Sequence, residues 1–342
     1  MLWASLALGP TVIFLHYASD IGDVGEFVLA AIALIPLAWL IGEATEHASH
    51  HTGPGVGGFI NATFGNAPEL IIALIAVHDG LTEVVRGSLT GSVVGNLLLV
   101  LGFSLAIGGR GDVDRRSSFT SLGLVGLATA AFFIPSIPGW SGDPNRHALA
   151  VISLPVAIAL LAVYVGVTWR ALRRHHEQHV AEDPAEMAGW SFRHSLGVLG
   201  AATLVTAFVA EVLVGSLETF ADAAGLSDFF VAAVIVAIVG NAAEHGGAIV
   251  IARHGNIKLA AEIALASSAQ VAVFLIPAVT IIAWAIEPLS LAFRPVELGV
   301  LAGATMLTAI LLRDGRSSRA KGVILIVGYV LAALAFLMAG DR

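Results

Sequence analysis

Long apolar runs make up most of this chain, and short polar stretches separate them. An apolar run of about 17–25 residues is long enough to cross the hydrocarbon core of a bilayer as a helix. We therefore predict an all-α polytopic membrane protein with eleven transmembrane helices, placed at residues 2–18, 24–42, 57–78, 86–108, 117–137, 147–169, 194–216, 228–252, 258–284, 293–312 and 320–339.

The longest polar stretch, residues 170–193, divides the predicted helices into two groups. It starts with a basic run and then becomes acidic, and six helices precede it while five follow. This pattern predicts four regions. They are an additional N-terminal helix at 1–20, a first five-helix repeat at 21–169, a cytoplasmic linker at 170–193 and a second five-helix repeat at 194–342.

The composition excludes several classes of protein. A hydrophobic fraction of 57%, a charged fraction of 12% and a mean hydropathy of +0.88 do not describe a water-soluble globule. The chain has no cysteine, which excludes disulfides and thiolate metal sites. Its net charge of −8 argues against nucleic acid as a partner. The apolar composition instead predicts the lipid bilayer as the surroundings of the chain. The N-terminus lacks the basic region of a signal peptide, so we predict that the first apolar run is retained.

The distribution of Lys and Arg predicts how the chain is oriented. Of the 17 basic residues, 13 fall on the side that the N-terminus shares with the even-numbered connections, and 4 fall on the other side. Because connections rich in Lys and Arg stay in the cytoplasm, we expect the N-terminus inside and the C-terminus outside. The third and eighth helices then run in opposite directions, so the two repeats are expected to be inverted in the membrane.

One short motif occurs twice, each time within a predicted transmembrane span. The second copy lies 175 positions after the first (240 minus 65), and the two read Gly65-Asn66-Ala67-Pro68-Glu69 and Gly240-Asn241-Ala242-Ala243-Glu244. A charged carboxylate at membrane depth costs about 2.5–3.5 kcal/mol on insertion scales, so such residues usually have a function. Two of them at matching positions indicate a transport site between internal repeats.

The same offset of 175 also relates residues outside the two motifs, which supports an internal duplication. The matching pairs are Glu43 with Glu218, Ala73 with Ala248, Gly80 with Gly255, and Ser92 with Ser267. We interpret Glu43 and Glu218 as candidates for residues that line the path by which ions enter, or that surround the direct ligands of the ion site.

The two motifs contain the residues that break helices. Pro68 has no N–H, so the carbonyl of Phe64 loses its helical partner, while Gly240 loosens the second copy through its backbone freedom. Gly65 occupies the equivalent position in the first copy. Freed carbonyls, the amides of Asn66 and Asn241 and two carboxylates form an oxygen-rich site. Such a site suits a hard cation such as Ca²⁺.

Each of these polar residues also has a simpler interpretation. The asparagines are compatible with hydrogen bonds between helices, and the small residues Gly57, Gly58, Gly246 and Gly247 with close helix packing. A structural ion pair is a weak explanation for Glu69 and Glu244, because neither apolar run contains a basic residue. Further polar residues follow each motif and are candidates to complete the lining: Ser92, Asn96 and Gln270.

A group of histidines and carboxylates follows the predicted span at 24–42. Glu43, Glu46, His47 and His50 recur at one helical face, which permits a transition-metal site. We favour the alternative, a hydrated helix end at the cytoplasmic mouth. His245 adjoins Glu244 and is positioned to tune its proton affinity, although adjacent helical side chains point along different faces.

The motifs together resemble the signature repeats of the CAX family, the calcium/proton exchangers of the Ca²⁺/cation antiporter superfamily. The first repeat is similar at residues 58–74 and 91–102, GFINATFGNAPELIIAL and GSVVGNLLLVLG, and the second at 239–245 and 267–270, VGNAAEH and SSAQ. The resemblance spans nearly the whole chain. Two departures are Pro68, where the family often has Thr, and a linker less acidic than in eukaryotic members, which makes Ca²⁺ sensing by the linker doubtful.

The resemblance implies a Ca²⁺ site at Glu69 and Glu244, surrounded by Asn66, Asn241, Ser92, Ser267 and Gln270. It also implies exchange of Ca²⁺ for H⁺ by alternating access, without an enzymatic activity or a cofactor, in a prokaryotic cell membrane. A Na⁺/H⁺ or K⁺/H⁺ antiporter of the same fold is the nearest alternative, since oxygen ligands also bind monovalent ions. A passive cation channel is a weaker one. An intramembrane hydrolase is weaker still, because the chain contains no His-Glu-x-x-His motif.

Overall fold

The computed structural model describes residues 2–19, 21–52, 60, 63–178 and 189–341. The predicted linker at 170–193 and the start of the span at 57–78 lie partly outside these residues. Among the described residues, eight helices are long and apolar enough to cross a membrane, or nine if one bent pair counts as a single span. Two shorter apolar helices cover residues 3–18 and 67–78. The predicted all-α membrane class is confirmed, whereas the count of eleven spans stays a prediction.

The first half of the chain contains the following elements in order. They are α1 (Leu2–Ser5), α2 (Leu8–Ala18), α3 (Asp23–His50), α5 (Ala67–His78), α6 (Thr82–Val94), the π-helical η1 (Gly95–Val100), α7 (Leu101–Gly108), β1 (Gly111–Asp112), α8 (Arg115–Gly139) and α9 (His147–Gln178).

The second half continues with α10 (Phe192–Gly215), α11 (Leu217–Ala224), α12 (Asp228–Phe230), η2 (Val231–Val236), α13 (Ala237–Gly240), α14 (Ala242–Arg253), α15 (Ile257–Gln270), η3 (Val271–Leu275), α16 (Ile276–Ala283), α17 (Pro295–Leu312), β2 (Arg316–Ser317) and α18 (Arg319–Ala339).

The helical path is interrupted at both copies of the repeated motif, as the sequence predicts. Gly65 and Asn66 form a turn, and α5 starts directly after them with Pro68 in its first turn, where the missing N–H is tolerated. Asn241 separates α13 from α14. The predicted span 228–252 is therefore not one continuous helix. At the break, the Asn241 side chain also donates to the carbonyl of Ala237, at 2.9 Å.

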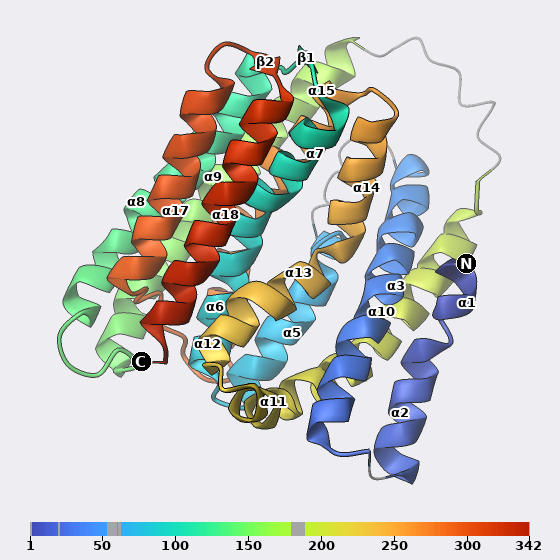
Figure 1. The fold of residues 1–342 in the computed structure, drawn as a ribbon, viewed down its shortest axis with the longest axis vertical. Coiled ribbons are helices and arrows are strands. Elements are labelled where there is room, and N and C mark those ends of the chain that lie inside the picture. The colour runs from blue at the N-terminus through green and yellow to red at the C-terminus, as the bar shows by residue number, and fades with distance from the viewer. Residues whose placement is uncertain (1, 20, 53–59, 61–62, 179–188, 342) are drawn as a thin grey trace.

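The two helices that follow the breaks point in opposite directions. Helix α5 ends at His78, close to the start of α6, whereas α14 ends beside the far end of α7, where Gly108 lies against Ala252 and Ile257. The continuous rod of α6, η1 and α7 connects these two ends. In Figure 1, α5 and α14 accordingly extend away from each other from the centre of the molecule. This is the geometry expected of inverted repeats.

The remaining helices form two packed groups around the broken segments. Helices α2, α3 and α10 lie side by side in one group, and α7, α8, α9, α15, α17 and α18 form the other (Figure 1). A two-stranded antiparallel ribbon pairs Gly111 with Ser317 and Asp112 with Arg316. The ribbon joins the α7–α8 and α17–α18 connections at one end of the bundle.

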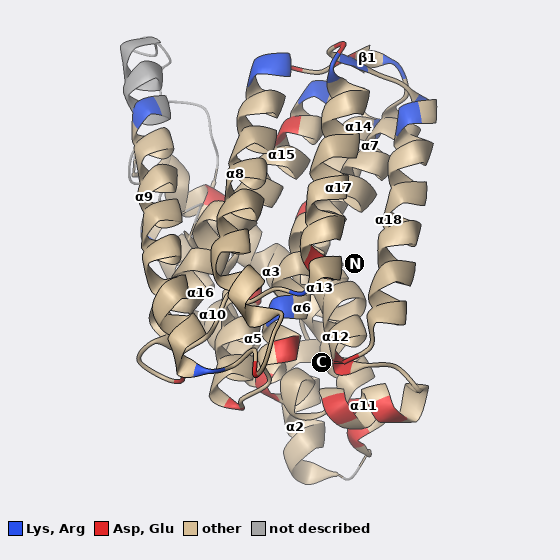
Figure 2. Cartoon of the chain, turned by 90° about the vertical axis from the view of Figure 1, so that its left-hand side faces the viewer, with Lys and Arg blue, Asp and Glu red and all other residues tan. Residues whose placement is uncertain are grey.

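Charged side chains are separated between the two ends of the molecule. Lys and Arg gather at the ribbon end, while Asp and Glu gather at the opposite end around α11 and the C-terminus (Figure 2). Because basic residues favour the cytoplasmic side, the ribbon end is expected in the cytoplasm, and the orientation stays a prediction.

Cysteine labelling at the two ends of α8 should establish the orientation. Ser117 and Ser141 are exposed, and they flank this single helix at the ribbon end and at the opposite end. In this cysteine-free chain, a membrane-impermeant maleimide applied outside should label the Ser141→Cys protein and leave the Ser117→Cys protein unlabelled. Both should react after permeabilisation, and the reverse pattern before permeabilisation would invert the topology.

Candidate functional site

The polar residues of the two motifs meet where the broken helices begin. Asn66 directly precedes α5 and Glu69 lies in its first turn, and Asn241 and Glu244 occupy the same positions in α14. Both asparagines are 1% exposed. The two helix N-termini therefore carry their partial positive charge next to the two carboxylates.

A chain of hydrogen bonds connects the second motif to α6, η1 and α15. Asn241 donates through Nδ2 to Ser92 Oγ at 2.8 Å, and its Oδ1 accepts from Asn96 Nδ2 at 3.3 Å. Asn96 also donates to Ser267 Oγ at 3.1 Å, and the Ser267 hydroxyl donates to the Glu244 carboxylate. These contacts fix Glu244 relative to both repeats, because Ser92 and Asn96 precede the linker while Ser267 follows it.

The first motif contacts the same region from the other side. Asn66 donates through Nδ2 to Gln270 Oε1 at 3.4 Å, which links the start of α5 to the end of α15. Glu69 is 7% exposed, and its carboxylate is close enough to Glu244 for electrostatic repulsion between them. Among the described residues, Glu69 Oε2 has no hydrogen-bond partner. A buried carboxylate oxygen of this kind is available to a cation.

The close approach of the two motifs depends on the absence of a side chain at Gly240. A Cβ at this position would lie 3.3 Å from Glu69 Cγ and 3.8 Å from Glu69 Oε1. Glu69 therefore rests directly on the backbone of the second motif. Gly65 lies in the turn before α5, at the equivalent point of the first motif.

Two π-helical segments lie at corresponding points beside the site. Segment η1 contains Asn96, and η3 begins at Val271, directly after Gln270. A π-helical turn inserts an extra residue into an α-helix and is frequent at functional sites. The sequence contains no signal that predicts these two turns.

The other candidate residues lie outside this hydrogen-bonded cluster. Glu43 is on α3, where its side chain is 38% exposed and pairs with His47 at 3.5 Å. Glu218 is exposed at the start of α11. His245 is half-buried, and its Nε2 has no hydrogen-bond partner among the described residues. The roles of these residues in an ion path or beside Glu244 stay predictions.

The histidine-rich end of α3 forms pairs rather than one larger cluster. His47 lies near Glu43 and stacks on Trp190 with ring centroids 5.0 Å apart, and His50 lies 3.9 Å from Glu46. Within the part of the chain that the structure describes, no group of three or more His, Asp or Glu side chains could hold a metal ion. No geometry in this region therefore supports the transition-metal alternative.

Taken together, the broken helices, the two carboxylates of the repeated motif and the membrane-spanning bundle define an integral membrane transporter. The chain belongs to the sodium/calcium exchanger protein family, whose family model matches residues 23–173 and again residues 194–338. The resemblance to the CAX exchangers is thereby confirmed at the level of the superfamily, and the relatives below support it further.

Several characterised proteins are similar along nearly the whole chain. The Ca(2+)/H(+) antiporter of Synechocystis sp. is 35% identical, covering 92% of this chain and 91% of that protein. The Ca(2+)/H(+) antiporter ChaA of Bacillus subtilis is 37% identical over 91% of this chain and 92% of its own. The structure of native YfkE superposes with a TM-score of 0.85 at 32% identity, covering 99% of this chain and all of that one, 100%.

A more distant solved structure shares the fold alone. The H+/Ca2+ exchanger CAX superposes with a TM-score of 0.74 at 16% identity, over 99% of this chain and 91% of that one. The all-α transporter architecture is therefore preserved across relatives whose sequences have diverged widely.

Proposed function

We propose that this chain exchanges Ca²⁺ for H⁺ by alternating access and exports Ca²⁺ from the cytoplasm under an inward proton gradient. The observation that carries the proposal is the meeting of buried Glu69 and half-buried Glu244, one from each motif, beside amide and hydroxyl groups. Relatives that cover nine-tenths of the chain are named Ca²⁺/H⁺ antiporters, which supports the choice of ions.

The donor set suits Ca²⁺ as the transported substrate. Ca²⁺ takes six to eight oxygen ligands in flexible geometry, typically carboxylates, amide or backbone carbonyls and water. Glu69 and Glu244 supply the charge, and Asn66, Asn241 and Gln270 supply neutral oxygens nearby. All of these groups are part of the chain, so the proposal requires no cofactor and no catalytic residue.

Electrostatics couples the two ions. Two carboxylates that share a poorly hydrated site repel each other when both are ionised, so an empty site takes up protons. Ca²⁺ neutralises the same two charges and therefore releases those protons on binding. If only the neutralised forms switch between inward- and outward-open states, neither ion crosses without the other. A permanently open channel would not show this coupling.

Ca²⁺ affinity should fall as the pH is lowered, because protons and Ca²⁺ compete for the Glu69 and Glu244 carboxylates. For each proton that Ca²⁺ displaces, the apparent Kd of Ca²⁺ should rise about tenfold for each unit by which the pH is lowered, in the range where the site titrates. The amount of Ca²⁺ bound at saturation should stay the same. Equilibrium ⁴⁵Ca²⁺ binding to the purified protein across a pH series measures both quantities.

Two variants and one ion substitution sharpen this test. Asn66→Ala and Asn241→Ala should weaken binding at every pH and leave its pH dependence in place, since amides do not titrate in this range. Replacing Ca²⁺ by Na⁺ in vesicle flux measurements separates the proposal from a monovalent antiporter. An affinity that stays flat where transport varies with pH would rule out a shared site.

A further inference from the structure

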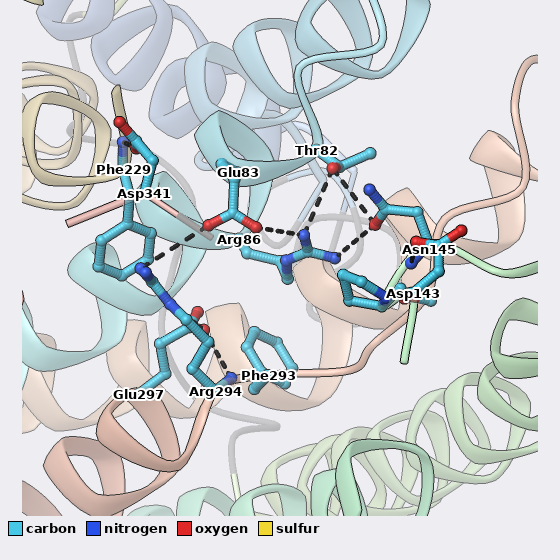
Figure 3. Close-up of polar contacts among 12 residues, drawn as sticks. Thr82, Glu83, Arg86, Asp143, Asn145, Phe229, Phe293, Arg294, Glu297 and Asp341 are labelled. Atoms are coloured by element: carbon cyan, nitrogen blue, oxygen red, sulfur yellow. Dashed lines mark hydrogen bonds and ion pairs between the residues drawn. The ribbon is translucent and has the colours of Figure 1, made fainter. Parts of the chain in front are cut away.

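A network of four charged residues, three of them buried, joins α6 to the start of α17 (Figure 3). Glu83 and Arg86 belong to α6, while Arg294 and Glu297 lie at the start of α17. Arg86 is 1% exposed and Glu297 is fully buried. Removing one member of such a pair is costly, because it leaves a buried charge without compensation. The network therefore constrains the helices that it joins.

Arg86 attaches the first part of α6 to the loop before α9. Its guanidinium donates to Glu83 Oε1 at 2.5 Å, to Asn145 Oδ1 at 3.2 Å and to Thr82 Oγ1 at 3.3 Å. Two of these three contacts remain within α6. Arg86 thus shapes the start of α6 and gives Glu83 a fixed orientation.

Arg294 connects α6 to three further segments. Its Nη2 lies 3.7 Å from Glu83 Oε2, and its Nε lies 3.4 Å from Glu297 Oε2. The guanidinium carbon sits 3.8 Å from the centre of the Phe229 ring on α12, a cation–π contact. Nη1 donates to the carbonyl of Gly340 at 2.6 Å. One side chain therefore contacts α6, α12, α17 and the C-terminal segment, as Figure 3 shows for the first three.

The two segments joined by Arg294 are the ones that carry the polar lining of the site. Helix α6 leads to Ser92 and Asn96, while α12 leads through η2 and α13 to Asn241. Between the network and the site, α6 packs closely on α12 and η2. A Cβ at Gly87 would lie 2.8 Å from the Phe229 carbonyl oxygen on α12, and a Cβ at Gly91 would lie 2.8 Å from Ala233 Cα on η2. A shift of α6 relative to α12 would thus be transmitted directly to the hydrogen bonds of Asn241.

We propose that Arg294 is a positioning residue for Ca²⁺ binding, which clamps α6 to α12 and so holds Ser92 and Asn96 in register with Asn241. The position of α6 also reaches Glu244, because Asn96 donates to Ser267 and Ser267 donates to Glu244. This inference rests on the proposed Ca²⁺/H⁺ exchange. It assigns a function to a buried arginine that lies outside the ion site.

Arg294→Gln should weaken Ca²⁺ binding on the order of tenfold, as expected when a group that orients metal ligands is lost. The exchange rate at saturating Ca²⁺, per mole of folded protein, should stay within about twofold of wild type, because the ligands themselves are intact. Arg294→Lys keeps the positive charge but loses the planar guanidinium, so the Ca²⁺ affinity of this variant should lie between that of wild type and that of Arg294→Gln. Equilibrium binding and vesicle exchange with purified full-length protein supply the two readouts.

Two further variants make the test decisive. Glu83→Gln removes the ion pair between Arg294 and α6 while it leaves Arg294 on Phe229, and it should also lower the Ca²⁺ affinity. Arg146→Gln is the matched control, since Arg146 lies at the same end and, among the described residues, its guanidinium donates to backbone carbonyls of the α8–α9 region, at Pro138, Ser141 and Asp143. Its Ca²⁺ affinity should equal that of wild type.

The outcomes separate this inference from the proposed function. Wild-type affinity in Arg294→Gln, or in Glu83→Gln if the first variant does not fold, would overturn the positioning role. Equal losses of affinity in Arg146→Gln would show a general effect of the region and overturn it as well. A wild-type protein that fails to exchange Ca²⁺ for H⁺ would instead refute the function.

Discussion

Exchange of Ca²⁺ for H⁺ should be abolished when either Glu69 or Glu244 is replaced by Gln. The amide has the size of the carboxylate, but it neither carries a charge nor takes up a proton in this pH range. Coulomb's law with an effective dielectric constant of about 20 gives several kcal/mol for one charge lost beside a divalent cation. Every 1.4 kcal/mol is about a tenfold loss of affinity, so binding should fall by at least about a hundredfold. Proton-gradient-driven Ca²⁺ flux in vesicles should reach background.

The double variant distinguishes a shared site from two separate ones. Residues that act as a unit are not additive, so Glu69→Gln with Glu244→Gln should be no worse than either change alone. Glu287→Gln is the matched control, because Glu287 is exposed in the connection after α16. Proton-coupled Ca²⁺ flux in either single variant, at wild-type protein levels, would contradict a site that needs both carboxylates.

The sequence alone was sufficient to predict the all-α membrane class and the two helix breaks. A polar residue within a long apolar run indicates a functional position, because placing its side chain in the bilayer costs free energy. Pro68 and Gly240 predicted the two interruptions, and the structure contains a break at each motif. The duplication predicted which polar groups meet at the centre, because equivalent positions of inverted repeats converge near the midplane of the membrane.

Contacts between residues far apart in the chain could not be predicted in this way. Glu83 and Arg294 are separated by 211 positions (294 minus 83), and no local pattern pairs them. The predicted span began at Arg86, at the membrane surface, whereas α6 starts at Thr82 and buries this arginine. Glu83, three positions earlier, was the one local signal for an ion pair. The π-helical turns at η1 and η3 depend on tertiary packing and leave no trace in the hydrophobic pattern.

Gly91→Ala should destabilise the protein and remove most of its Ca²⁺ binding. A Cβ at Gly91 would overlap the carbonyl oxygen of Ala233 and would lie 2.8 Å from Ala233 Cα, so α6 and η2 would have to separate. The obstacle is backbone and cannot rotate away as a side chain could. Overpacking of this kind typically costs about 1–3 kcal/mol, occasionally more. Ser92 is the next residue, so the same separation would lengthen its hydrogen bond from Asn241.

Thermal unfolding and Ca²⁺ binding of the purified variant test this expectation together. Gly126→Ala is the control, because Gly126 lies within α8 and a Cβ there meets nothing within 4 Å. Alanine is favoured over glycine inside a helix by about 1 kcal/mol, so this control should keep or raise the Tm. A Gly91→Ala protein with the Tm and the Ca²⁺ affinity of wild type would show that α6 and η2 are not in backbone contact. The register between Ser92 and Asn241 would then have to depend on other contacts.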